Sequence, residues 1–435
     1  MKRLIIFLIA VLSLTADAYS QWTLQSTPTT RNLNSLFILN PTTLYAAGDY
    51  GVILKTTNAG TNWVKQRESV EIWHLYGIWF QNENTGIAVG GIDSYPKRSI
   101  IFRTTNGGNN WDSLIINGIY FRGLYFINST TGFAGGWTGY PNVSPIYKTT
   151  NAGLNWFQMA PFNSFGIENF YFLNENTGFA TGDIVGSEVV FKTNDGGNNW
   201  NIIANFSIIT TWLCSVVFIN DQTGWITGWQ QVPFWGGLLR KTTDGGTTWT
   251  HQNNHNTNEL YEQIYLNENT GWVVGDSPKI QKTTNGGLNW NVQTTPDALW
   301  MWDVKFINEN TGWTVGSQGK IFYTTNGGGP VSISNLNNDI PSSYHLYQNY
   351  PNPFNPVTKI KFDLGHTPSP LSRGEFVSLK VFDILGKEVA ALVNEQLKPG
   401  TYEVKFDGSN LFNGVYFYKL SAGNYIETKK LVLLK

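Results

Sequence analysis

The chain consists of short apolar runs interrupted by Gly, Asn and Thr. One interrupting motif, Phe-x-Asn-x-x-Thr-Gly-x-x-x-Gly, joins two β-rich runs, as at Asn82–Gly90, and the first copy has Leu44 in place of the turn Gly. Asn closes such turns with its own side chain, and Gly supplies the positive φ of a hairpin. The pattern therefore predicts a hairpin at each copy. The motif Asn recurs at Asn40, Asn82, Asn128, Asn174, Asn220, Asn267 and Asn308.

A second motif, the box, alternates with the first and reads Lys-Thr-Thr-Asn-Gly-Gly-x-Asn-Trp. Its copies are Lys55–Trp63, Arg103–Trp111, Lys148–Trp156, Lys192–Trp200, Lys241–Trp249, Lys282–Trp290 and, without the Trp, Tyr323–Val331. We expect Asn58 to bond the backbone amides that follow it, Gly60 to allow a tight turn and Trp63 to start the next strand. Each repeat then runs strand, fixed turn, strand, variable loop, strand, box, strand.

Consecutive box Trp residues are 41–49 residues apart, a period typical of four-stranded propeller blades. Seven copies predict an all-β fold with a seven-bladed β-propeller over residues 21–330. The seventh box ends in Val331, whereas Trp22–Gln25 repeats the Trp-x-x-Gln start of a fourth strand. We predict that residues 22–25 complete the seventh blade and remove an exposed edge. The alternative is that Val331–Ser334 forms that strand and Trp22 belongs to a loose arm.

These boxes resemble the Asp-box repeat of sialidases and related propellers. The full repeats, from Trp22 to Val331, resemble the photosystem II assembly-factor family of seven-bladed propellers. The resemblance implies the fold. It implies little about function, because the box stabilises a turn and carries no chemistry.

After Gly327–Pro330 the chain changes character. Residues 331–343 lack periodicity and contain Ser, Asn and Pro, which predicts a linker. Residues 344–435 alternate in short runs between Gly and Pro turns, which predicts a small Ig-like β-sandwich.

This last unit resembles the type A C-terminal sorting domain of cargo for the type IX secretion system. The matching blocks are Tyr350–Pro356, Val381–Val389, Leu397–Tyr402, Asn413–Leu420 and Lys429–Lys435. The resemblance implies the outer-membrane translocon and sortase as partners, passage through the periplasm, and delivery to the cell surface or the medium with the domain removed afterwards.

The N-terminus predicts a signal peptide over residues 1–20. Lys2 and Arg3 precede an apolar run from Leu4 to Leu14, and small-x-small cleavage sites follow. Cleavage after Ala18 or Ser20 fits equally well. The apolar run is shorter than the roughly 20 residues that span a bilayer, and no other stretch approaches that length, so no membrane span is expected.

Composition narrows the functions that remain. The net charge is −1 and no basic block occurs, which argues against a nucleic-acid partner. The single Cys214 excludes an internal disulfide and a Cys-based metal cluster, and we predict it to be a buried structural thiol. His251 and His255 lie in an Asn-rich segment rather than on a helix, so no metal site is expected. No phosphate loop or dinucleotide fingerprint occurs, and no cofactor is expected.

A ligand site is expected on one face of the propeller. The interval between the second-strand Gly and the box varies from 7 residues, at Gly275–Lys282, to 13, at Gly90–Arg103, whereas the fixed turns do not vary. The varied loops share one face, which we call the varied-loop face and where a propeller usually binds. The candidate binding residues at the starts of the first strands are Trp73, His74, Tyr76, Tyr120, Arg122, Glu168, Trp212, Glu259, Tyr261, Trp300, Trp302 and Asp303, and the loop Trp229–Trp235 adds two more Trp.

Aromatic side chains on a polar rim suit recognition of a glycan or a protein. The alternative is that most of these Trp pack between blades. We expect a non-enzymatic binding protein. The competing hypothesis is a glycoside hydrolase or sialidase-like enzyme in which Glu168, Glu259, Glu262 and Asp303 converge at the channel mouth, although nothing in their spacing requires it.

Overall fold

The computed structural model describes residues 22–138, 145–159, 166–184, 187–206, 211–231, 236–252, 259–276, 280–293, 295–297, 299–328, 334–337, 341–365, 375–386, 388–408 and 411–435. Across these ranges the protein is all-β, with nine four-stranded antiparallel sheets and two short 3-10 turns, η1 (Asp49–Gly51) and η2 (Ser317–Gly319). No helix in the described ranges has the length and apolarity to cross a membrane. The predicted signal peptide, residues 1–20, lies outside the described residues.

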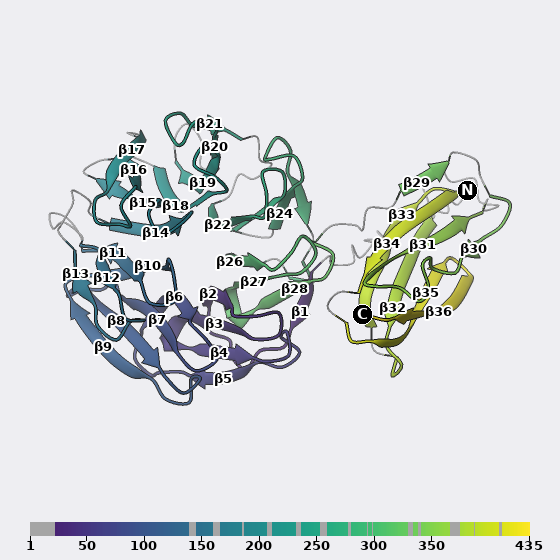
Figure 1. Cartoon of the computed structure of the whole chain (residues 1–435), viewed down its shortest axis with the longest axis horizontal. Helices are drawn as coiled ribbons and strands as arrows, with labels where there is room; N and C mark the ends of the chain where they lie inside the picture. Colours follow the sequence, from purple (N-terminus) through teal and green to yellow (C-terminus); the bar gives the residue numbers. More distant parts are fainter. Residues whose placement is uncertain are drawn as a thin grey trace, which may run out of the picture.

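Seven of the sheets are arranged around a central axis as the blades of a propeller (Figure 1). Blade 1 comprises β2 (Leu33–Ile38), β3 (Leu44–Gly48), β4 (Ile53–Thr56) and β5 (Val64–Arg67). Blade 2 comprises β6 (His74–Phe80), β7 (Gly86–Ile92), β8 (Arg98–Thr104) and β9 (Asp112–Asn117). Blade 3 comprises β10 (Tyr120–Phe126), β11 (Gly132–Trp137), β12 (Tyr147–Thr149) and β13 (Phe157–Gln158). Blade 4 comprises β14 (Gly166–Phe172), β15 (Gly178–Ile184), β16 (Ser187–Thr193) and β17 (Asn201–Phe206). Blade 5 comprises β18 (Thr211–Phe218), β19 (Gly224–Gln230), β20 (Gly236–Thr242) and β21 (Thr250–His251). Blade 6 comprises β22 (Leu260–Tyr265), β23 (Gly271–Gly275), β24 (Ile280–Thr283) and β25 (Asn291–Gln293). Blade 7 comprises β26 (Met301–Phe306), β27 (Gly312–Gly316), β28 (Ile321–Thr324) and β1 (Thr23–Gln25).

Local hydrogen bonds explain why the two motifs form turns. In the first box, Thr56 Oγ1 accepts from the Gly60 amide at 3.0 Å, and Asn58 Oδ1 accepts from the Asn62 amide at 2.9 Å. Gly60 has a φ of 85°, which a residue with a Cβ rarely adopts. At the other motif, Asn82 Oδ1 accepts from the amides of residues 84 and 85. The predicted roles of the Asn and of the box Gly are confirmed. The prediction that the Gly of the hairpin motif supplies a positive φ is wrong, because Gly86 begins β7 with an ordinary φ, and its lack of a Cβ instead makes room for the Phe80 ring. Both fixed turns lie on the same face of each blade.

The N-terminal strand closes the ring as predicted. β1 pairs with β28 from Thr23 to Gln25, and Trp22 is fully buried. Its indole Nε1 donates to Gln293 Oε1 of blade 6 at 2.9 Å. Gln25 repeats this contact towards blade 1, because its Oε1 accepts from Trp63 Nε1 at 3.0 Å. The Trp-x-x-Gln sequence is therefore a link between successive blades, and it joins blade 7 to both neighbours.

The remaining two sheets form the C-terminal β-sandwich. One contains β29 (Ser334–Asn337), β34 (Gly400–Asp407), β31 (Val357–Leu364) and β30 (His345–Leu346), in that spatial order. The other contains β33 (Glu388–Leu397), β32 (Glu375–Phe382), β35 (Gly414–Ala422) and β36 (Tyr425–Leu433). Apolar side chains from both sheets, such as Phe362 and Tyr418, share one buried core. The predicted sandwich is confirmed.

One boundary needs correction. Ser334–Asn337 falls within the predicted linker, residues 331–343, but forms β29 and pairs with β34. The sequence gives no signal for this strand, because Ser and Asn are poor strand formers and only the free edge of β34 holds them extended. This segment belongs to the sandwich.

Candidate binding site around the propeller axis

The first strand of every blade carries a β-bulge at the same place. These strands surround the centre of the ring (Figure 1), and in each the pairing with the second strand skips one residue. A bulge re-aims the side chain of the unpaired residue. The seven skipped residues, here called the bulge ring, are Asn34, Tyr76, Arg122, Glu168, Cys214, Tyr261 and Trp302.

All seven bulge-ring residues are half-buried, so each keeps some surface open to solvent. They lie near the starts of the first strands and therefore towards the varied-loop face. Their side chains differ in charge, size and polarity, whereas the boxes on the other face are near copies of one another. The bulge ring is thus a surface without seven-fold symmetry, at one end of the propeller axis.

The sequence carries a signal for this ring that our sequence reasoning did not use. Every bulge-ring residue lies six positions before the Asn of its hairpin motif, as Tyr76 does before Asn82. Five of the predicted binding residues are members, but Asn34 was missed. Cys214 was expected to be a buried core thiol and is instead half-buried in the ring. Its surroundings raise the pKa of its thiol through burial, so the group stays protonated.

Blades 2–4 contribute an ion pair with aromatic neighbours. Arg122 Nε donates to Glu168 Oε2 at 3.0 Å, and the guanidinium lies 4.5 Å from the centre of the Tyr76 ring. Trp137 Nε1 donates to the other carboxylate oxygen of Glu168. Burial opposes the charge on Arg122, but Glu168 outweighs it and raises the pKa of the guanidinium. Arg122 is therefore a partnered cation.

A second polar contact joins blades 1 and 2. His74 Nδ1 lies 2.7 Å from Asp49 Oδ1, which also accepts from Asn34 Nδ2 at 3.0 Å. Asn32 Nδ2 donates to Asp49 Oδ2 at 2.9 Å. Burial alone would raise the pKa of Asp49, but these three donors together lower it. His74 and Asn34 are thus held in place by one carboxylate.

Blades 5–7 present aromatic faces instead. The Trp212 ring stacks on Trp229, with centroids 4.7 Å apart and planes at 10°. Trp300 meets Trp302 edge to face, with centroids 6.4 Å apart. Trp212 is 38% exposed and Trp300 is 47% exposed. On blade 6, between them, the Tyr261 hydroxyl donates to Glu259 Oε2 at 2.8 Å.

Three of the predicted binding residues are not available at the surface. Trp73, expected to keep an exposed ring, is buried in the core between blades 1 and 2 and donates to Glu71. Tyr120 is buried and packs edge to face against Tyr76. Asp303 is buried, accepts from the Leu36 amide at 2.8 Å and pairs with Lys305. For these three, packing between blades is the correct interpretation. Trp235 and His255 lie outside the described residues.

The carboxylates named for the enzyme hypothesis have structural partners. Asp303 is buried as described, and Glu262 accepts from Ser215 Oγ at 2.6 Å and from the Gln263 amide. On the strand paired with that of Glu168, Asp183 has a buried carboxylate oxygen with no hydrogen bond, and burial raises the pKa of Asp183 to about 7. Glu188 is also buried, which raises the pKa of its carboxyl to about 9.

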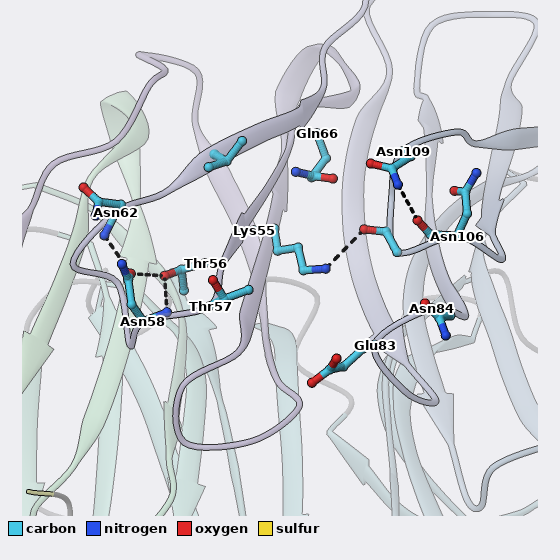
Figure 2. A pocket seen from close by; sticks show the side chains of 12 residues that line it. Lys55, Thr56, Thr57, Asn58, Asn62, Gln66, Glu83, Asn84, Asn106 and Asn109 are labelled. Carbon is cyan, nitrogen blue, oxygen red and sulfur yellow. Dashed lines mark hydrogen bonds between the residues drawn. The ribbon is translucent and has the colours of Figure 1, made fainter. Parts of the chain in front are cut away.

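A pocket on the opposite face lies between the boxes of blades 1 and 2 (Figure 2). It has a volume of about 440 Å³ and is lined mainly by Asn and Thr side chains, together with Lys55. Lys55 Nζ donates across it to the Gly107 carbonyl at 3.3 Å. Lys148 and Lys241 make the same contact with the next box, at 3.1 Å each. This pocket is therefore a repeated inter-blade feature rather than a distinctive site.

Comparison with known proteins assigns the two parts of the chain. The fold defines the first part as a seven-bladed β-propeller. Residues 348–434 match the secretion system C-terminal sorting domain, so the protein carries a type IX sorting signal and is exported to the cell surface or the medium. No curated protein matches this chain.

Among solved structures, YCF48 bound to D1 peptide is 18% identical, with a TM-score of 0.56 over 71% of this chain and 96% of that one. YCF48 from Cyanidioschyzon merolae is 15% identical, with a TM-score of 0.55 over 70% of this chain and 98% of that one. An ancestral GH74 enzyme is 13% identical, with a TM-score of 0.54 over 94% of this chain and 63% of that one. At these identities the similarity establishes the fold alone.

Proposed function

We propose that this exported protein is a binding protein without catalytic activity, and that its ligand, a glycan or a protein, contacts the bulge ring on the varied-loop face. One observation carries the proposal: seven structurally equivalent, half-buried positions hold six different residue types, and only Tyr occurs twice. A ligand lacks seven-fold symmetry, so its recognition needs side chains that differ between blades. The boxes on the other face repeat the same contacts.

The division of the chain fits this role. We propose that residues 1–20 are removed as a signal peptide, that residues 21–330 are the binding module, and that the C-terminal unit, residues 344–435, is the address. The translocon and sortase of the type IX pathway are then the partners of the sorting domain. The apolar core of the sandwich is separate from the inter-blade clusters, which supports two independently packed units.

The glycoside hydrolase alternative has less support. Two of its four carboxylates are engaged with neighbouring blades: Glu262 accepts from Ser215 of blade 5, and Asp303 accepts from the Leu36 amide of blade 1 and also pairs with Lys305 on its own strand. Glu168 is held by Arg122 and Trp137, and Glu259 by the Tyr261 hydroxyl. Glycoside hydrolysis requires a pair of carboxyl groups placed on either side of the glycosidic bond. The four carboxyl groups named for this hypothesis are instead held by partners within the protein.

An array of glycans and surface proteins, probed with the full-length protein, tests the proposed function. The variant Trp302→Ala should lose the signals that the wild type gives, because it removes a bulge-ring side chain. The matched control is Asn62→Ala, which removes an exposed side chain from the box-face pocket and should keep those signals. Thermal melting confirms that both variants fold. Loss of binding in Asn62→Ala but not in Trp302→Ala would place the site on the wrong face.

A further inference from the structure

The two sides of the varied-loop face differ in chemistry. Blades 2–4 hold the Arg122–Glu168 pair, whereas blades 5–7 hold the exposed rings of Trp212 and Trp300. We infer, resting on the proposed function, that the ligand is a neutral oligosaccharide that lies across blades 5–7 and stacks on Trp212 and Trp300.

Both indole rings are held in fixed planes. Trp212 is a cross-strand partner of Trp229 and stacks flat on it, with planes at 10°. Trp300 is fixed by an edge-to-face contact at 84° with Trp302. A ring that is already ordered loses little conformational entropy when a ligand covers it. Flat, rigid and partly exposed aromatic faces are suited to the apolar face of a sugar ring.

Blade 6 places hydrogen-bonding groups between these rings. Tyr261 is a bulge-ring residue, and its hydroxyl orients the carboxylate of Glu259 through Oε2 at 2.8 Å. The carboxylate and the phenol oxygen are acceptors for sugar hydroxyl groups. Two aromatic platforms separated by a polar blade match an oligomer of at least two sugar units rather than a monosaccharide.

Charge selects against acidic glycans. The first strands carry two permanent cations, Arg122 and Lys305, and each is paired with a carboxylate, at 3.0 Å and 2.6 Å. Glu259 adds a carboxylate just before β22 of blade 6, the blade between those that carry Trp212 and Trp300. A uronate or sialate in this position would meet a carboxylate and no unpaired cation on these strands, which costs binding energy. A neutral sugar avoids this repulsion.

Titration calorimetry of the full-length protein tests the inference. The probes are neutral hexasaccharides of glucose, xylose, mannose and N-acetylglucosamine, together with oligogalacturonate, hyaluronan oligomers and sialyllactose. At least one neutral probe should bind, with a Kd that changes less than about twofold between low and high salt, because no ion pair forms. Trp300→Ala and Trp212→Ala should each raise that Kd about tenfold or more.

Phe157→Ala is the matched control, because Phe157 is 46% exposed, close to the 47% of Trp300, but lies on the outermost strand of blade 3. Its Kd should stay within about twofold of the wild type. Binding only to acidic probes in calorimetry, or binding on the array only to a surface protein and lost in Trp302→Ala, would overturn the neutral-glycan inference and leave the proposed binding function standing. Glycan binding that none of the Trp212, Trp300 and Trp302 variants weakens would overturn both.

Discussion

Replacing Trp22 by Ala tests how the ring is held closed. Trp22 is fully buried against Phe306 and donates a hydrogen bond to Gln293, itself 2% exposed. Truncation of a buried Trp to Ala costs about 3–5 kcal/mol. It also leaves Gln293 Oε1 without its donor, and a stranded buried acceptor costs about 1–3 kcal/mol. We therefore expect the propeller to lose at least about 4 kcal/mol of unfolding free energy.

Urea denaturation followed by Trp fluorescence measures this loss, with two controls from the same segment. Trp22→Phe keeps much of the ring but not the hydrogen bond and should lose an intermediate amount. Leu24→Ala changes a side chain in β1 that is 38% exposed, and it should cost less than about 1 kcal/mol. A loss below about 1 kcal/mol for Trp22→Ala would refute the closure argument, because it would mean that blade 7 is stable without the buried Trp22 side chain.

Two further predictions concern pH and export. Burial raises the pKa of Asp183 to about 7 and of Glu188 to about 9. Between about pH 4 and 9 the folded state therefore holds protons that the unfolded state has already released. The free energy of unfolding should fall as the pH rises through this range. Glu188→Gln should flatten this slope in thermal melts, and an unchanged slope would contradict the assignment. Deleting Lys429–Lys435 removes Leu431 and Leu433 from the sandwich core. Cell fractionation should then find the protein in the periplasm, with the melting transition of the propeller unchanged. Normal delivery of the truncated protein to the cell surface would count against the role of this domain as a sorting signal.

The propeller can be predicted from the sequence because its turns are stabilised locally. Thr56, Asn58 and Gly60 bond within a few residues of one another, so the same nine-residue box forms wherever it occurs. The closure of the ring can be predicted in the same way. The seventh box lacks its Trp, and Trp22 is the one remaining Trp that can stand at the start of a fourth strand. The sorting blocks identify the sandwich in the same way, by order and spacing.

The individual members of the site depend on tertiary contacts. Trp73 and Trp300 both stand at the start of a first strand, but Trp73 is covered by packing against blade 1, whereas Trp300 keeps 47% of its surface. Arg122 and Glu168 are partners because neighbouring blades bring together bulges that lie 46 residues apart in the chain.

The sequence alone determined the repeat, the turns, the closure and the export signal, because each is encoded by residues that act within one short segment. The tertiary structure alone decided which rings stay exposed, which charges are paired and that Ser334–Asn337 extends along β34. The physical reason is that burial and ion pairing depend on which blade or strand lies alongside, and a single repeat does not specify its neighbour's side chains.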